Sequence, residues 1–381
     1  MDREAAIDAV RLINAIVAIK KSAKILNTFI AAFSLATEKH DGKHYLHGSF
    51  HVNGTVSGRM SSSSPNLQNL PSGSTYGKLV KSCFVAPTGW IFVGSDFNAL
   101  EAKIDALLTH DPNKVAVYAA MMDSHAFNTA QYFPDEMPDI TEALSKANEK
   151  DKVAIINTIP DLYPDLRQRS KTLTFAMQYG GSYIAIMNSS GCSEQEAKQI
   201  IESYDNAYAV AKQYTADRIL QATHDGYVTV AFGLRVRTPI LSQTILNTKS
   251  TPYEAQSEAR TAGNALSQSY GLLNNRAGIE MQKRILASKY KNDIRPIAQI
   301  HDAQYYLVRD NVSCIKWFND NLVECMAWQD LPELQHDKVK LGANVELHYE
   351  GWHQPIKLEN SISTREIMAT CTKGVDKIKE R

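Results

Sequence analysis

Residues 296–308 read PIAQIHDAQYYLV, and this stretch decides the fold. Two short apolar segments flank the polar pair His301-Asp302, a pattern that predicts two strands joined by a tight turn. Much earlier in the chain, residues 90–96 read WIFVGSD, which predicts a buried strand that ends in the carboxylate of Asp96. Both predicted strand segments therefore carry an aspartate at one end.

The two aspartates, Asp96 and Asp302, are the first candidate site. If both strands belong to one sheet, two converging carboxylates form a hard-oxygen site suited to Mg²⁺. A pair of such ions can carry out an in-line phosphoryl displacement. The alternative is that each aspartate only ends its strand, which is the commoner role of a single strand-end Asp. An unpaired buried carboxylate would be costly, so either role requires solvent or a partner.

The rest of the chain mixes helical and strand-like patterns. Further elements are predicted as helices at 1–40, 100–110, most of 113–225, 253–289 and 312–328, a hairpin at 226–236 and a strand at 338–348. Helices and antiparallel strands alternate without βαβ regularity, so the fold class is α+β.

Composition limits the protein class. The chain has 381 residues, 44% of them apolar, and its 41 basic and 41 acidic side chains give a net charge of zero. A nucleic-acid site must therefore come from local clustering of basic residues. The five cysteines form no CxxC pair, which argues against a zinc site and favours a reducing compartment. No apolar run is long enough for a membrane span.

A stripe of four residues is the second candidate site. Arg167, Lys171, Phe175 and Tyr179 follow one another at four-residue steps, so they share one helical face. Two cations followed by two aromatic rings match the phosphates and base of a nucleoside triphosphate. The alternative is an amphipathic helix whose aromatics face the core and whose cations are solvated, and the pattern alone leaves both open.

Two further patterns suit nucleic acid. Arg260, Asn264 and Gln268 also recur at four-residue steps, and long polar donors on one helix face suit the duplex minor groove. An ordinary solvated face is the alternative. Residues 54–71 place many small and amide side chains around Arg59, which suggests a backbone close to a ligand or duplex, or simply a structured turn.

Taken in order, four segments resemble DNA polymerase family A. SGRMSS at 57–62 with PNLQNLP at 65–71 is similar to the family's TGRLSS…PNLQNIP, and SDFNALEAK at 95–103 is similar to motif A, usually DYSQIELR. RQRSKTLTFAMQYG at 167–180 is similar to motif B, RxxxKxxxFGxxYG, and IHDA at 300–303 is similar to motif C, usually VHDE. The resemblance spans roughly residues 10–355 and includes features typical of phage members.

The resemblance implies a metal site. Asp96 and Asp302 would bind two Mg²⁺ ions, with Mn²⁺ as an alternative, and the Phe97 carbonyl would be a further ligand. Ala303 stands where the family usually has Glu, so a third acidic group is missing. We expect activity to survive this departure with an altered metal preference.

The resemblance also implies a nucleotide site. Lys171, Arg167 and His125 would hold the triphosphate, and Lys171 would protonate the departing pyrophosphate. Glu101 matches the acid that excludes a ribose 2′-hydroxyl. Phe175 matches the position that governs discrimination against dideoxynucleotides.

Contacts with DNA follow from the same resemblance. Tyr179 would stack at the nascent base pair. The residues expected to touch primer–template DNA are Arg59, Asn66, Gln68, Arg260, Asn264, Gln268 and His301.

The implied architecture is a right-hand polymerase fold. It has an antiparallel-sheet palm, helical fingers and a partial helical thumb. The predicted subdomains are a partial thumb at 1–50, palm at 51–112 and 253–381, and fingers at 113–252.

The implied activity is template-directed addition of deoxynucleotides to a primer 3′ end. Nothing resembling the family's proofreading domain precedes residue 1, so we expect no exonuclease activity on this chain, with a separate exonuclease or processivity protein as partner. The expected location is the cytoplasm of a bacterium or of an infected host cell. Two alternatives remain: a degenerate polymerase fold that serves as a DNA-binding replisome scaffold, and a single-subunit RNA polymerase. Glu101 together with Phe175 argues against the RNA polymerase.

Overall fold

The computed structural model describes residues 3–71, 75–178, 180–246, 248 and 250–379. The chain divides into two compact units. The first, called the sheet unit, comprises Met1–Asn98, Leu273–Ala327 and Gly342–Arg381. The second, called the helical unit, comprises Ala99–Leu272 and Trp328–Leu341.

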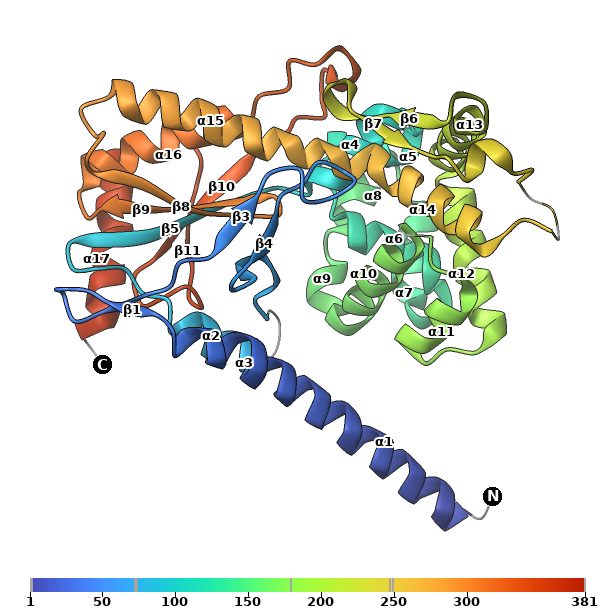
Figure 1. The fold of residues 1–381 in the computed structure, drawn as a ribbon. Coiled ribbons are helices and arrows are strands. Elements are labelled where there is room, and N and C mark those ends of the chain that lie inside the picture. Colours follow the sequence, from blue (N-terminus) through green and yellow to red (C-terminus); the bar gives the residue numbers. More distant parts are fainter. Residues whose placement is uncertain (1–2, 72–74, 179, 247, 249, 380–381) are drawn as a thin grey trace. The chain divides into compact units, whose positions relative to one another are not determined.

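The sheet unit is built on a five-stranded antiparallel sheet in the order β11-β10-β5-β9-β8 (Figure 1). Its strands are β5 (Trp90–Phe97), β8 (Ile294–Ile300), β9 (Ala303–Arg309), β10 (Ala343–His348) and β11 (Ile356–Leu358). The apolar segments on either side of His301-Asp302 are thus the paired strands β8 and β9. The α+β class is confirmed.

The two faces of the sheet carry different side chains, because successive residues on a strand point to opposite sides. On β5, Ser95 is buried and its hydroxyl donates to the Met326 sulfur of α16 (Val312–Met326), so this face packs on a helix. On the other face, the Phe92 ring stacks on Tyr305 at 5.5 Å between centroids. Asp96 lies on that second face, away from α16.

The sheet unit contains eleven further described elements besides the sheet and α16. They are α1 (Arg3–Lys24), the π-helix η1 (Ile25–Ile30), α2 (Ala31–Phe33), β1 (Thr37–Glu38), β2 (His44–Tyr45), β3 (Ser49–His51), β4 (Ser61–Ser63), η2 (Leu67–Asn69), α3 (Thr75–Ser82), α15 (Leu272–Ala287) and α17 (Thr364–Lys379). The start of α16 is fixed by Asn311, whose side chain accepts from the Ser313 and Cys314 backbone amides.

The helical unit contains most of the helices. They are α4 (Leu100–Thr109), α5 (Pro112–Ala119), α6 (Ser124–Tyr132), η3 (Pro134–Glu136), α7 (Pro138–Lys146), α8 (Glu149–Ile156), α9 (Ile159–Leu162), α10 (Pro164–Gln178), α11 (Tyr183–Ser190), α12 (Glu194–Ala207), α13 (Ala209–Asp225), η4 (Ala231–Gly233), η5 (Leu241–Gln243), α14 (Tyr253–Gln268), η6 (Ser269–Gly271) and η7 (Pro332–Leu334). The predicted hairpin is present as β6 (Tyr227–Thr229) and β7 (Arg235–Arg237).

Helix α10 follows directly from its sequence. Pro164 occupies its first turn, where the missing backbone N–H has no cost. Its buried side chains are Ser170, Leu173 and Thr174, and Leu173 belongs to a core with Tyr132. This buried face leaves Arg167, Lys171 and Phe175 on another side of the helix.

Three predicted elements differ in the structure. The helix predicted at 1–40 ends at Phe33 after a π-helical segment at Ile25–Ile30, and Thr37–Glu38 is a strand. The single helix predicted at 253–289 is interrupted at η6, where the buried Ser269 side chain accepts from the Ala231 amide and Tyr270 donates to Glu333 at 2.9 Å. The strand predicted at 338–348 begins only at Ala343, because the backbone before it is bonded to side chains, including Leu341 to Gln329 at 2.8 Å. Over the described residues, no helix is long and apolar enough to cross a membrane.

Candidate active site

The two candidate metal-binding aspartates lie on neighbouring strands of the sheet unit. In the register of β5 and β9, Asp96 is opposite Ala303, the residue that follows Asp302. The Phe97 amide, one residue beyond Asp96, lies 3.4 Å from the Asp302 carbonyl oxygen. The antiparallel ladder therefore brings both carboxylates to the same end of the sheet.

The turn that carries Asp302 is held by an amide the sequence did not indicate. His301 has a φ of +52°, an uncommon conformation for a residue other than glycine. The Asn274 amide donates to the carbonyls of His301 at 3.1 Å and Ala303 at 3.2 Å, and Gln304 donates to Asn274 in turn. Asn274 sits on α15, and nothing in its local sequence points to this role.

A cavity of about 350 Å³ opens at the carboxylates. It is lined by Leu67, Gln68, Leu70, Lys81, Asp96, Ile300, His301, Asp302, Ala303, Tyr305 and Trp352. Sequence analysis missed Lys81 and Trp352, whose ammonium nitrogen and ring centroid are 4.9 Å apart. No local sequence pattern indicated this role for Lys81, because its partner Trp352 lies far along the chain.

The charge of this cavity suits a divalent cation. Asp96 is reached by solvent from the cavity, but protein crowds its other sides. This partial burial, followed by the charge of Asp302, raises the pKa of Asp96 to about 6. A hard cation bound beside Asp96 would offset the charge repulsion from Asp302 that disfavours the ionisation of Asp96. Among the described residues no three His, Cys, Asp or Glu side chains gather as a metal site.

Arg59 contacts one of the two carboxylates. Its guanidinium donates to both Asp302 oxygens, at 3.0 and 3.3 Å, and both side chains are about one-fifth exposed. Gln68 is buried and donates to the Gln299 carbonyl at 3.2 Å, while Asn66 accepts from the Gln68 amide. These three predicted DNA contacts thus lie in the sheet unit, beside the cavity, where they have partners within the protein.

In the helical unit, helices α6 and α10 bring the predicted triphosphate residues together. Arg167 donates to both oxygens of Asp123, the closest contact being 2.6 Å. Asp123 also caps α6 by accepting from Ala126. Burial alone would raise the pKa of Asp123, but the hydrogen bonds from Arg167 and from the Ala126 amide, together with the charges of Arg167 and His125, outweigh burial and the pKa is lowered. One of the two predicted phosphate-binding cations is therefore already paired.

His125 lies beside Phe175, with ring centroids 5.6 Å apart. Burial, followed by the charges of Lys171 and Arg167, lowers the pKa of His125 to about 4, although Asp123 opposes this shift. The imidazole is therefore neutral at pH 7. Its Nδ1 is buried and has no hydrogen-bond partner in the described part of the chain.

The other nucleotide-site residues are also in the helical unit. Lys171 is half-buried and makes no ion pair with any residue that the structure describes. Phe175 is 40% exposed, so the aromatic of the stripe does not face the core. Glu101, in the first turn of α4, accepts from Ser267 at 3.4 Å. Tyr179 lies outside the described residues.

The polar face of α14 borders the end of α10. Arg260 is exposed, and Asn264 and Gln268 are half-buried. Gly180 has a φ of +72°, and a Cβ there would lie 3.2 Å from Arg260 Cδ. Glycine is therefore required both by the backbone conformation and by the close approach of Arg260.

Structural comparison identifies the class of fold. The fold resembles the POL domain of Pol1 from M. smegmatis, solved in complex with DNA primer–template and dNTP, with a TM-score of 0.69 and 23% identity. The match covers 87% of this chain and 52% of that one. The fold is thus the right-hand polymerase fold.

Sequence comparison identifies the family. The model of DNA polymerase family A matches residues 4–354, and the chain belongs to that family. DNA polymerase I of Pseudomonas aeruginosa is 27% identical over 268 residues, which is 70% of this chain and 26% of the relative. The thermostable DNA polymerase I of Thermus thermophilus is 27% identical over 239 residues, or 63% of this chain and 26% of the relative. The matched region is about a quarter of the length of these relatives. Family A DNA polymerases generally depend on divalent metal ions.

Proposed function

We propose that this chain is a template-directed DNA polymerase that adds deoxynucleotides to a primer 3′ end. The observation that carries the proposal is the convergence of Asp96 and Asp302 on one cavity through the register of β5 and β9. Family membership and the stripe on α10 support it. The predicted partners are primer–template DNA, deoxynucleoside triphosphates and a separate exonuclease or processivity protein, with the cytoplasm as location.

The carboxylate cavity would hold the metal ions. Asp96, Asp302 and the Phe97 carbonyl would be the protein ligands of two Mg²⁺ ions, or of Mn²⁺. Bound there, the ions would activate the primer hydroxyl and neutralise charge on the transferred phosphoryl group. Ala303 supplies no third acid, so the two aspartates would carry the whole protein contribution of charge.

The helical unit would bind the incoming nucleotide. Arg167 and Lys171 would pair with its phosphates, and neutral His125 would donate a hydrogen bond to them. The primer 3′ oxygen bonds to the α-phosphorus as the bond from that phosphorus to the bridging oxygen breaks. Lys171 would give its proton to the departing pyrophosphate. Glu101 and Phe175 would exclude a 2′-hydroxyl.

The face of α14 would contact the duplex. Arg260, Asn264 and Gln268 would reach minor-groove acceptors, which are alike in every base pair, so pair geometry rather than sequence would be tested. Arg59, Asn66, Gln68 and His301 would contact DNA from the sheet unit. Tyr179 would stack at the nascent pair. The proposed subdomains remain a partial thumb at 1–50, palm at 51–112 and 253–381, and fingers at 113–252.

Primer extension tests the proposal. The parent chain, with excess primer–template, Mg²⁺ and deoxynucleotides, should extend a labelled primer by the templated residues, and Asp96→Asn should not. Asp320→Asn, which changes an exposed carboxylate paired with Lys316, is the matched control and should extend normally. Binding of DNA without extension by the parent chain would favour the scaffold alternative, which Ala303 suggests. Equal use of ribonucleotides would favour an RNA polymerase.

A further inference from the structure

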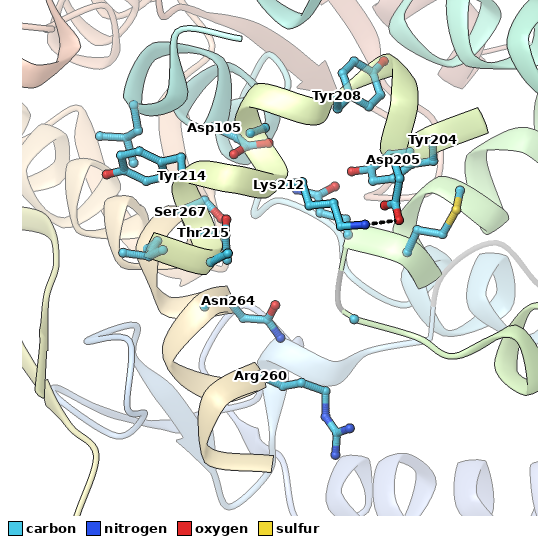
Figure 2. Close-up of a pocket in the computed structure, with 18 of the residues that line it drawn as sticks. Asp105, Tyr204, Asp205, Tyr208, Lys212, Tyr214, Thr215, Arg260, Asn264 and Ser267 are labelled. Atoms are coloured by element: carbon cyan, nitrogen blue, oxygen red, sulfur yellow. Dashed lines mark hydrogen bonds and ion pairs between the residues drawn. The ribbon is translucent and has the colours of Figure 1, made fainter. Parts of the chain in front are cut away.

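Helix α1 of the sheet unit has no part in the proposed reaction. It differs in this from the pocket of about 710 Å³ in the helical unit, where Arg260 and Asn264, both proposed duplex contacts, lie opposite the Asp205–Lys212 ion pair (Figure 2). α1 is a long helix that leads directly into the π-helix η1 (Figure 1). Its surface is the largest apolar feature of the sheet unit without an assigned role.

Large apolar side chains are exposed along α1. Leu12, Ile16 and Ile19 are 63, 44 and 67% exposed, and Leu26, in the first turn of η1, is 58% exposed. A contiguous patch of exposed apolar side chains marks a surface that another molecule or segment covers. Phe29 of η1, in contrast, is buried. Within the described part of the chain, α1 is therefore anchored at its carboxyl end and apolar on an exposed side.

The exposed side of α1 has the seven-residue period of a coiled-coil seam. The residues that follow one another at alternating steps of three and four are Ala9, Leu12, Ile16, Ile19, Ala23 and Leu26. All six are exposed or half-buried. The π-helical turn then changes the helical period, so the seam ends near Leu26. A seam of this kind faces a second helix.

The sizes of the seam residues favour a second copy of α1 in the antiparallel direction. When Ile16 of one copy lies opposite Ile19 of the other, Ala9 lies opposite Leu26 and Leu12 lies opposite Ala23. Each small side chain then faces a large one, so the layers fill without voids. Parallel pairing would set each alanine against its own equivalent and leave two layers unfilled. The seam is therefore complementary to itself in one direction only.

The charges beside the seam permit this pairing. Lys20 would lie beside Ile13 of the other copy, where its methylene chain covers that side chain while its ammonium reaches water. Asp8, on the other side of the seam, is paired with Arg11 of its own helix at 3.3 Å. Antiparallel helices also bring opposite ends of their dipoles together. No like charges meet across the seam.

The seam is long enough for a stable dimer. α1 has 22 residues, which is about 33 Å of helix. Helix α3 adds to the same surface, because Ser22 Oγ lies 3.4 Å from the Tyr76 hydroxyl and both Tyr76 and Leu79 are exposed. A pair of such helices reaches about 1,200 Å² of total buried surface, the lower limit of a stable interface. The expected dissociation constant is therefore micromolar.

We propose that α1 pairs with α1 of a second copy of this chain in an antiparallel coiled coil, which makes the protein a homodimer. The occupant is a second copy because the seam fits its own reverse, small side chain against large. The inference uses no step of the polymerase reaction and goes beyond it. A dimer would carry two carboxylate cavities on one particle.

Sedimentation equilibrium of the full chain tests the pairing, over about 0.5 to 100 µM protein. The mass should rise from the 42.4 kDa of one chain to twice that value, with a dissociation constant of about 10 µM. Ile16→Glu places a charge in the central layer and should raise this constant by at least about 100-fold. Ile7→Glu makes the same change at an exposed position on the opposite side of α1 and should keep the constant within about twofold.

An exchange of charges tests the direction of the pairing. Ile19→Lys alone should also raise the dissociation constant by at least about 100-fold, because its ammonium would lie against Ile16. In an equal mixture of the Ile16→Glu and Ile19→Lys chains, the carboxylate of one faces the ammonium of the other, so dimers should form again. Parallel pairing would not bring these two groups together. Circular dichroism reports whether each variant keeps its helices.

The inference is overturned by a parent chain that stays monomeric at about 100 µM, by a dimer that Ile16→Glu does not weaken, or by a mixture that does not dimerise. A monomeric parent whose Ile16→Glu variant loses affinity for primer–template would assign this side of α1 to the duplex instead. Primer extension by a monomeric parent would leave the polymerase proposal intact. Dimerisation without extension would leave only the present inference intact.

Discussion

The carboxylate cavity of the sheet unit and the cation stripe of the helical unit are built in different ways. Asp96 and Asp302 are placed by a strand register and by a turn that Asn274 holds. Lys171 is a flexible side chain on a helix face, and Arg167 is held by Asp123. The strands fix positions closely, as reacting atoms require, whereas a helix face can hold a substrate that arrives and leaves with each cycle.

The largest effect should come from the carboxylate cavity. Asp302→Asn keeps the size of the side chain but removes a metal-binding charge, so the rate of primer extension should fall by about 10³-fold, equivalent to about 4 kcal/mol. Single-turnover extension at saturating nucleotide would measure it. A reduction of the extension rate by less than tenfold would mean that Asp302 is not a catalytic residue.

A smaller effect is expected in the stripe. Lys171→Ala should lower kcat/KM for the nucleotide by about 10²-fold, because it removes both a phosphate contact and a proton donor. Steady-state kinetics over a range of nucleotide concentrations would measure it, with Lys198→Ala, an exposed ion-paired lysine, as the control. Unchanged kinetics would place the triphosphate elsewhere.

The packing of the sheet can be tested at Gly94, whose neighbour Tyr305 lines the carboxylate cavity. A Cβ at Gly94 would lie 2.8 Å from Tyr305 Cε1, so Gly94→Ala should reduce the free energy of unfolding by about 1–3 kcal/mol. Gly342→Ala is the matched control, because nothing lies within 4 Å of its Cβ position, and it should change stability by less than about 0.5 kcal/mol. Denaturant unfolding measures both. Equal effects would show that Tyr305 is free to move aside.

The smallest effect concerns pH. Burial raises the pKa of Asp96 from 3.8 to about 6 in the folded chain, so the unfolded state loses this proton first. Stability contributed by this group therefore falls as pH rises from about 4 to 6 and stays lower above 6. Without metal, Asp96→Asn should melt at a higher temperature than the parent at pH 7.5 and at the same temperature near pH 4. A melting temperature lowered at pH 7.5 would contradict the raised pKa.

Local patterns predicted the elements that carry the chemistry. The apolar runs ending in Asp96 and flanking Asp302 are short, continuous and bounded, so the strands could be identified from neighbouring residues alone. The walls of the carboxylate cavity could not be predicted in this way, because Lys81 and Trp352 come together only when distant segments of the chain pack. The pairing of Arg167 with Asp123 could not be predicted either. A four-residue spacing shows that residues share a helix face, but it does not show which side chains from other elements contact that face.

The contact between Arg59 and Asp302 has a consequence for the order of binding. The same guanidinium is the proposed minor-groove contact, so the carboxylate and the duplex would compete for it. Arrival of DNA would draw Arg59 away and leave Asp302 without its cation, so metal affinity should rise when primer–template is bound. By thermodynamic linkage, bound metal should increase the affinity for DNA by the same factor. The DNA-free protein would therefore bind metal ions weakly, and its metal affinity would rise once primer–template is bound.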